Sequence, residues 1–318
     1  MLPADVANVT ARADGIRCQP GALSSWNLAK GLADALARSA SAADLGYELD
    51  VIDLDAYFTR IGYAGSTEPS LATLNAISMA HVCAIPFENL DVLRGVPIDL
   101  DPGALEQKLV HARRGGYCFE QNTLLLEVLG QLGFRAQPIS ARVRWGRTRD
   151  YTPARTHLFV RVELAEGSFL ADVGVGSMSL TRALQLGEGE QATPHEPRRI
   201  IRENDRLYHQ ARLGDTWHDV NEFTLEEMPL IDRIVGNWYT SAHPQSHFRS
   251  RLIAARATPD GGRITLADRD LTQRARNGAA TVTRIADHAE LLAVLERQFG
   301  ITLPAGTQLA WPGLDWTA

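Results

Sequence analysis

The chain has 318 residues, with 32 Lys and Arg, 38 Asp and Glu, a formal net charge of −6 and 45% hydrophobic residues. These values are ordinary for a folded globular protein and exclude disorder over most of the chain. The acidic balance argues against a nucleic-acid-binding protein, and the length allows about two domains.

The cysteines indicate the compartment. Cys18, Cys83 and Cys118 are odd in number, widely spaced and form no CxxC pair. This is a poor disulfide framework and is typical of a reducing environment. Residues 1–30 lack the continuous apolar segment of a signal peptide, and the longest uncharged stretch, 69–87, is too polar for a membrane span. We therefore expect a cytoplasmic protein with no membrane partner.

The first part of the chain predicts helices. Residues 1–50 carry only a thin hydrophobic pattern, and we expect an extension that is either a tail or a peripheral helix. A short helix from 54 ends at Gly62 or Gly65, and a second one begins after an N-cap at Ser70 and runs to 82. Further helices are indicated over 102–110 and from Cys118 to Gly133.

Beyond residue 137 the hydrophobic period changes to two, which predicts strands. Residues 157–164 alternate, and a turn at 165–168 leads to a return strand over 169–176. More short strands over 197–202, 206–212 and 216–220 suggest a barrel. The last part combines strands over 251–257, 262–266 and 280–285 with a helix over 287–299.

Cys118 is a candidate nucleophile because it opens a predicted helix. The positive end of the helix dipole favours a thiolate, and Arg113 and Arg114 add positive charge nearby. Gly115 and Gly116 would allow a bulky substrate to approach the backbone. Considered alone, a cysteine at a helix start is more often structural.

A nucleophilic cysteine needs a base, and the base needs an orienting group. His157 points away from the apolar face of its strand, and Asp172 lies in an apolar strand where a carboxylate needs a partner. With a turn at 165–168, Asp172 pairs with Arg161 and shares a face with His157, two cross-strand steps away. Contact between His157 and Asp172 therefore requires a bulge, a strong coil or a longer turn, and pairing with Arg161 is the alternative.

The sequence predicts no metal site. His81 lies beside Cys83 without further ligands at metal spacing, and Pro244 separates His243 from His247. The motifs HExxH, GxxxxGK[ST] and GxSxG do not occur, so zinc hydrolases, P-loop enzymes and serine hydrolases have no support.

Five ordered segments resemble signatures of the arylamine N-acetyltransferase family. They are LDAYFTRIGYAG (54–65), IPFENLD (85–91), RRGGYCFEQN (113–122), THLFVRV with ADVGVG (156–162 and 171–176) and NWYTSAHPQSHF (237–248). The resemblance implies an α+β fold with a cysteine-protease-like catalytic core. Its expected parts are the N-terminal extension (1–50), a helical bundle (51–135), a central β-barrel (136–236) and a C-terminal α/β lid (237–318).

The resemblance also implies a Cys-His-Asp triad of Cys118, His157 and Asp172. The expected reaction is a ping-pong transfer of acetyl from acetyl-CoA, the acyl donor substrate, to the nitrogen of an arylamine or arylhydrazine. No metal is expected. Motif matching assigns further positions to the acceptor pocket, which are Phe87 and Phe119, and to the CoA cleft, which are Thr156, Gly176 and Phe248.

Two departures from the family pattern leave questions open. Val175 and Ser177 replace the usual aromatic and glycine of DVGFGG, which widens the expected cleft edge and leaves the acyl and acceptor preferences open. Family members usually begin near Leu54, so one hypothesis is that translation starts at Val51. An amide synthase that releases a polyketide chain with the same triad is the alternative function. A thiol protease, a transglutaminase-like enzyme and a non-catalytic binding module are more distant, and the oligomeric state is not predicted.

Overall fold

Helices fill the segment before the first long strand in the computed structural model, which describes residues 51–316. The predicted extension over 1–50 lies outside these residues. The helices are α2 (Leu54–Ile61), α3 (Leu71–Ala84), α4 (Leu90–Leu93), α5 (Pro102–Leu105), the π-helical segment η2 (Glu106–His111) and α6 (Cys118–Gln131). Their limits follow local signals. Ser70 caps α3 through its side chain, and Gly62, with a left-handed φ of 66°, ends α2.

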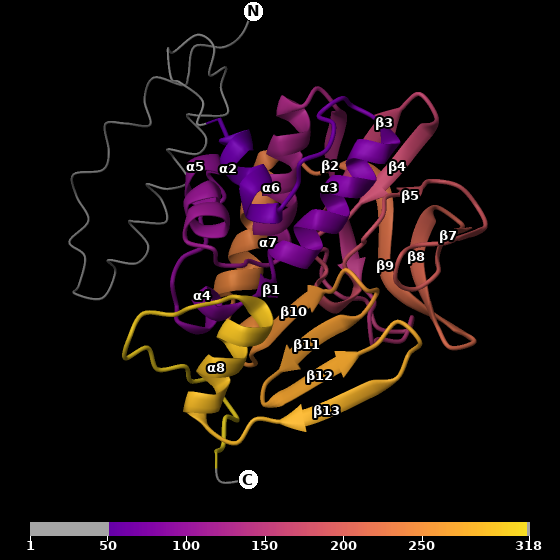
Figure 1. Ribbon diagram of the computed structural model, residues 1–318. Helices are drawn as coiled ribbons and strands as arrows, with labels where there is room; N and C mark the ends of the chain where they lie inside the picture. The colour runs from indigo at the N-terminus through magenta and orange to yellow at the C-terminus, as the bar shows by residue number, and fades with distance from the viewer. Residues whose placement is uncertain (1–50, 317–318) are drawn as a thin grey trace, which may run out of the picture. The chain divides into compact units, whose positions relative to one another are not determined.

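An eight-stranded antiparallel sheet follows and curls into a near-closed barrel (Figure 1). Its strand order is β5-β4-β3-β2-β9-β8-β7-β6. The strands are β2 (Arg135–Val143), β3 (His157–Leu164), β4 (Gly167–Ala171), β5 (Leu184–Gln185), β6 (Glu190–Gln191), β7 (Arg198–Glu203), β8 (Arg206–Leu213) and β9 (Thr216–Glu227). The one-turn helix η3 (Gly176–Met178) comes after β4.

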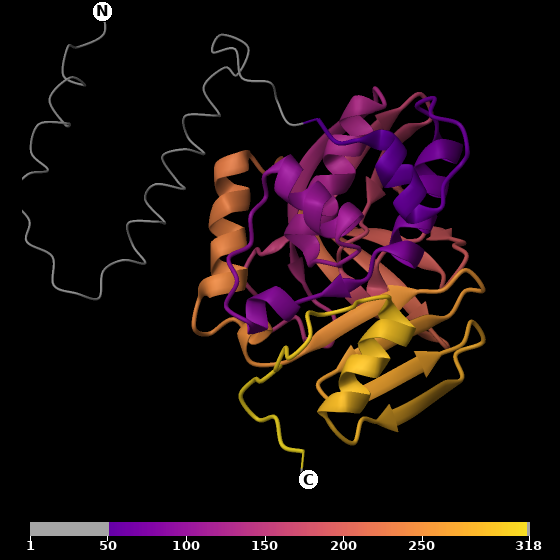
Figure 2. The same ribbon diagram turned by 60° about the vertical axis from the view of Figure 1, so that its left-hand side comes forward.

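A second antiparallel sheet has the order β1-β10-β11-β12-β13 and is covered by α8 (His288–Phe299), as Figure 2 shows. Its strands are β1 (Phe87–Glu88), β10 (Ile253–Ala257), β11 (Arg263–Ala267), β12 (Asp270–Arg274) and β13 (Ala280–Arg284). The helices α7 (Leu230–Ala242) and η4 (His247–Arg249) connect β9 to β10. Strand β1 comes from the helical part and pairs with β10, and Phe87 of β1 also forms a bridge with Gly116, which lies two residues before α6.

The hairpin of β3 and β4 has a tighter turn than the sequence predicted. Leu164 pairs with Gly167, and the pairing continues to Val160 with Ala171, so only residues 165 and 166 form the turn. The predicted four-residue turn is therefore wrong, and the register moves by two residues. Continued by one residue, the pairing brings Asp172 opposite Phe159, the next inward-facing neighbour of His157. Neither a bulge nor a longer turn is needed.

Strand β3 is buried on both faces because it separates two cores. Val160 and Val162 pack against the helices, while Phe159 packs inside the barrel against Phe223, with ring centroids 5.0 Å apart. Alternate residues of β3 therefore face different cores, one between the sheet and the helices and one inside the barrel. Within residues 51–316, no helix is long and apolar enough to cross a membrane.

Candidate active site

Cys118 is the first residue of α6 and is 4% exposed. Its Sγ atom lies 3.6 Å from the carbonyl oxygen of Thr156, the residue before β3. The start of the helix is held by Glu120, whose Oε2 atom accepts the Tyr117 N–H at 3.0 Å. Lys108 in turn donates to Glu120 Oε1 at 2.6 Å. The helix start is thus fixed by a buried ion pair rather than by a small capping residue.

The two glycines before Cys118 serve close packing of the protein itself. A Cβ on Gly115 would lie 2.1 Å from the carbonyl oxygen of Pro86, and one on Gly116 would lie 2.8 Å from Glu120 Oε2. The prediction that they admit a substrate does not fit these contacts. Arg114 bonds to Glu88, so its charge is balanced by a carboxylate.

His157 and Asp172 are in contact inside the barrel. His157 Nε2 lies 2.8 Å from Asp172 Oδ2, and the two side chains are 1% and 0% exposed. The His157 side chain also hydrogen-bonds Cys118, so the histidine lies between the thiol and the carboxylate. Burial lowers the pKa of His157, but the negative charges of Asp172 and Cys118 outweigh it and raise that pKa to about 10. The arrangement favours a protonated His157 between the Asp172 carboxylate and the Cys118 sulfur.

Asp172 is held as an anion by four donors. Besides His157, Oδ1 accepts from Asn122 Nδ2 at 3.0 Å and from the Gly174 N–H at 3.1 Å, and Oδ2 accepts from Asn221 Nδ2 at 3.3 Å. Burial raises the pKa of Asp172, but His157 and these donors lower it below its ordinary value. The prediction of Arg161 as an alternative partner is not realised, because Arg161 pairs with Glu163.

Asn122 and Asn221 are site residues that sequence reasoning missed. Asn122 also donates to the Leu158 carbonyl at 2.6 Å and accepts the Val173 N–H at 3.0 Å, so it joins α6 to both strands of the hairpin. Its signal was available, because it follows Cys118 by four residues and shares its helix face. Asn221 had no such signal, since its strand lies far away in the sequence.

Aromatic side chains surround Cys118. Phe87, Phe119 and Cys118 belong to one buried cluster, against which Phe248 packs. The rings of Phe87 and Phe248 are 6.0 Å apart, and a Cβ on Gly176 would lie 3.5 Å from the Phe87 ring. The structure therefore brings together Phe87, Phe119, Thr156, Gly176 and Phe248. Of these, Phe119 is fully buried, beneath α7.

The signature segments far from Cys118 act on the loop that leads to it. Tyr57 bonds to His81 at 2.8 Å, and His81 bonds to Gln121 at 2.6 Å. Gln121 then donates to the carbonyls of Pro86 and Gly116. Tyr57 of the first signature and Pro86 of the second are thus linked by hydrogen bonds to the loop that leads to Cys118.

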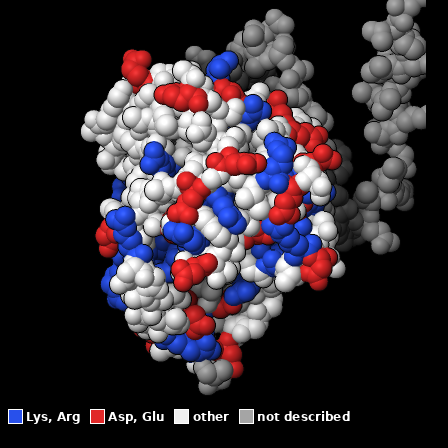
Figure 3. Space-filling model, turned by 90° about the vertical axis from the view of Figure 1, so that its right-hand side faces the viewer, with Lys and Arg blue, Asp and Glu red and all other residues white. Residues whose placement is uncertain are grey.

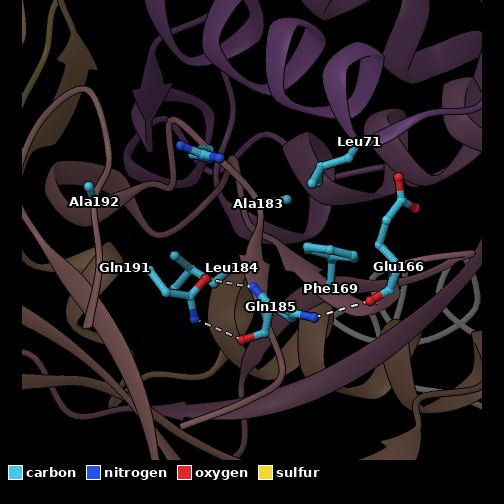
Figure 4. Close-up of a pocket in the computed structure, with 9 residues that line it drawn as sticks. Leu71, Glu166, Phe169, Ala183, Leu184, Gln185, Gln191 and Ala192 are labelled. Atoms are coloured by element: carbon cyan, nitrogen blue, oxygen red, sulfur yellow. Dashed lines mark hydrogen bonds between the residues drawn. The ribbon is translucent and has the colours of Figure 1, made fainter. Parts of the chain in front are cut away.

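A separate pocket of about 320 Å³ lies near β4, β5 and β6 (Figure 4). It contains none of Cys118, His157 and Asp172, and Gln185 and Gln191 hydrogen-bond to each other at its wall. Its lining residues are Leu71, Glu166, Phe169, Arg182, Ala183, Leu184, Gln185, Gln191 and Ala192. We assign it no catalytic role.

Positive and negative side chains are interspersed over the face seen in Figure 3. Arginines pair with acidic neighbours elsewhere in the described chain as well as in sequence-local pairs; Arg149, for example, pairs with Glu203 and Asp219. In the part of the chain that the structure describes, no group of three or more His, Cys, Asp or Glu side chains is arranged to hold a metal ion.

Comparisons with known proteins agree with this geometry. The model of the N-acetyltransferase family matches residues 70–308. The arylamine N-acetyltransferase of Mycolicibacterium smegmatis is 45% identical over 257 residues, covering 79% of this chain and 93% of that protein. The structure of the M. tuberculosis arylamine N-acetyltransferase has a TM-score of 0.76 at 44% identity, with 78% and 94% of the two chains covered. That of the Mycobacterium marinum enzyme in complex with CoA has a TM-score of 0.75 at 42% identity, with 78% and 93% covered.

Proposed function

The chain belongs to the arylamine N-acetyltransferase family, and from this premise we propose that it carries an acetyl group on Cys118 between two substrates. The donor is acetyl-CoA, and the acceptor is the nitrogen of an arylamine or arylhydrazine. A CoA complex of a structural neighbour supports the donor. The observation that carries the mechanism is the buried His157, which bonds to Asp172 at 2.8 Å and also to Cys118.

In the first half-reaction, the Cys118 thiolate attacks the thioester carbonyl of acetyl-CoA. In this proposal backbone N–H groups at the start of α6 stabilise the oxyanion of the tetrahedral intermediate, and that of Cys118, the first residue of the helix, is the candidate donor. The carbon–sulfur bond to CoA then breaks, and the imidazolium of His157 gives its proton to the leaving thiolate. The products are free CoA and acetyl-Cys118, with a neutral His157.

In the second half-reaction, the amine nitrogen attacks the acetyl carbonyl of Cys118. Neutral His157 takes the proton that the nitrogen loses, and the bond to Cys118 breaks. This regenerates the thiolate–imidazolium pair. Aromatic amines suit the step because they are weak bases and remain unprotonated at neutral pH.

The aromatic cluster indicates where substrates bind. We assign Phe87 and Phe119 to the acceptor side and Thr156, Gly176 and Phe248 to the entry of the CoA arm. Phe119 is fully buried and its ring lies close to Gly236 of α7, so its contact with an acceptor requires a movement of the residues that cover it. Val175 packs against the cluster of Met178, Ala211 and Val220, and its short side chain in place of an aromatic ring supports a wider acceptor pocket.

In this proposal the helical bundle (51–135) supplies the nucleophile, the barrel (136–236) supplies the base and its carboxylate, and residues 237–318 form the lid. The unpaired thiols of Cys83 and Cys118 are consistent with a reducing compartment, the cytoplasm.

The test is mass spectrometry after incubation with acetyl-CoA and no acceptor. We expect one acetyl group on Cys118 of the native protein and none on the Cys118→Ala variant, which should still fold because it removes only one sulfur atom. Addition of an arylamine should then discharge the adduct and release the acetylated amine. A native protein that never acquires the adduct would refute the proposal. An adduct that no arylamine or arylhydrazine discharges would favour the amide synthase.

A further inference from the structure

The inward face of the barrel is divided into an apolar and a polar part. The polar part contains Asp172, Asn221 on β9, His209 on β8 and Arg198 on β7, and each of these residues is 0% exposed. His209 pairs directly with Asn221, and Arg198 pairs with Ala211, two residues beyond His209. The three side chains therefore point to the same face. The apolar part is filled by Ile139, Ala141, Phe159, Leu170, Leu180, Leu184, Ile200, Leu207 and Phe223.

The contact with Arg198 fixes the tautomer of His209. Arg198 Nη1 lies 3.0 Å from His209 Nε2, and a guanidinium only donates, so Nε2 must accept. Burial and the charge of Arg198 lower the pKa of His209 well below its ordinary value. His209 is therefore neutral, and its single ring N–H is on Nδ1.

A donor and an acceptor then remain close to the triad. His209 Nδ1 and Asn221 Oδ1 are both buried and have no hydrogen-bond partner among residues 51–316. They belong to directly paired residues, whose Cβ atoms in a sheet are about 4.5–5.5 Å apart. A buried polar atom without a partner costs about 1–3 kcal/mol, and buried water commonly provides the missing bonds.

We propose that one buried water joins His209 Nδ1 to Asn221 Oδ1, and that His209 and Asn221 are positioning residues for Asp172. The proposal rests on the proposed function, because it concerns the carboxylate of the same triad. The water and His209 fix the amide of Asn221 so that Nδ2 points at Asp172 Oδ2. Arg198 is fixed in turn by Glu196 and by the Met178 carbonyl.

The readout is the pH dependence of Cys118 acetylation. The groups that act on His157 are Asp172 and Cys118, and those that act on His209 are Arg198, Asp172, Glu196 and His157. When Asp172 is free to turn away, the imidazolium of His157 loses its stabilising charge and releases its proton at lower pH. The alkaline limb of the pH profile, which is the fall of the acetylation rate at high pH, then moves to lower pH.

The experiment compares His209→Leu with His209→Gln in the full chain, with acetyl-CoA as donor in single-turnover measurements, because the leaving CoA thiolate takes its proton from His157. Leucine removes both polar groups of the ring, so we expect the alkaline limb to move down by about one pH unit, a tenfold loss of rate on that limb. Glutamine offers an acceptor to Arg198 and a donor to the water, so its limb should stay near that of the native protein.

Leu207→Ala is the matched control, because Leu207 lies on the same strand and face but in the apolar part. It should lower the melting temperature without moving the alkaline limb. Asn221→Ala should move the limb, and adding His209→Leu should move it little further, since the two act on one path. A high-resolution crystal structure should show the water bonded to both side chains.

Three results would overturn the proposal: an unmoved limb in folded His209→Leu, an equal shift in Leu207→Ala, or a crystal structure without the water. None of them affects the Cys118 adduct experiment, so failure here and failure of the proposed function are distinguishable.

Discussion

At the scale of single residues, the charge of His157 in the proposed triad depends on Asp172. Its two oxygens receive four hydrogen bonds, and its negative charge holds the pKa of buried His157 at about 10 despite burial. If a neutral side chain of the same shape replaced Asp172, the effect of burial would dominate and would lower the pKa of His157. The imidazolium would then lose its proton at lower pH.

We therefore predict that Asp172→Asn slows acetylation of Cys118 at neutral pH by roughly a hundredfold to ten-thousandfold. The native rate should remain high until the pH approaches about 10, the pKa of His157, whereas the alkaline limb of the variant should fall at lower pH. Stopped-flow acetylation over a range of pH measures both. A variant with the native profile would show that the carboxylate does not act on His157.

The same pair determines how stability depends on pH. The pKa of His157 is raised in the folded state, so its contribution is fully present below its ordinary value of about 6.5 and is lost as the pH rises through about 10. The pKa of Asp172 is lowered, so its contribution is present above about 3.8 and is lost as the pH falls through its folded value. The difference in unfolding free energy between native and Asp172→Asn protein should thus be largest between these ordinary values.

A glycine next to the triad allows its elements to meet. A Cβ on Gly174 would lie 2.8 Å from Cys118 Cα and 2.6 Å from Asn122 Nδ2, and the Cys118 backbone cannot yield without moving α6. We predict that Gly174→Ala costs about 1–3 kcal/mol of stability and lowers the acetylation rate. Gly130→Ala on α6 is the control, because nothing lies within 4 Å of the added carbon. It should be neutral or stabilising by up to about 1 kcal/mol in thermal unfolding. Equal behaviour of the two variants would contradict the packing argument.

At the scale of elements, the sequence predicted what local signals determine. The ends of α2 and α3 follow from Gly62 and Ser70, and the C-terminal strands and helix lie close to their expected bounds. Helix α7 was not predicted, because it follows Pro229 without a side-chain cap and three of its apolar residues, Ile231, Val235 and Trp238, are exposed. Strand β12 was also missed.

The hairpin shows why the site could be predicted only in part. The alternation of apolar residues along the two strands predicted that His157 and Asp172 share one face of the sheet. This prediction is correct, because a register shift of two residues leaves each side chain on the same face. The distance between them depended on the turn, and composition alone did not distinguish two turn residues from four. Asn221 and His209 were beyond local reasoning, since strand order brings them to Asp172.

At the scale of the whole described molecule, one carboxylate joins the barrel to the C-terminal sheet. Glu196, which precedes β7, pairs with Arg198 of the barrel and with Arg263 and Arg274 of β11 and β12. Burial raises the pKa of Glu196, but these arginines outweigh it and hold that pKa far below its ordinary value. Its contribution to stability is therefore present above about 4.5 and is lost only in strong acid.

We predict that Glu196→Gln destabilises the protein by about 3–5 kcal/mol, because it leaves Arg198 and Arg263, which are 0% and 3% exposed, as buried cations without a counterion. Asp270→Asn is the matched control, since Asp270 pairs with Arg284 in solvent on the same sheet and an exposed pair contributes about 0–1 kcal/mol. Denaturant unfolding at pH 7 measures both. Because Arg198 also bonds to His209, Glu196→Gln should in addition move the alkaline limb of Cys118 acetylation downward, and the control should not. A variant as stable as the control would show that the three arginines do not depend on Glu196.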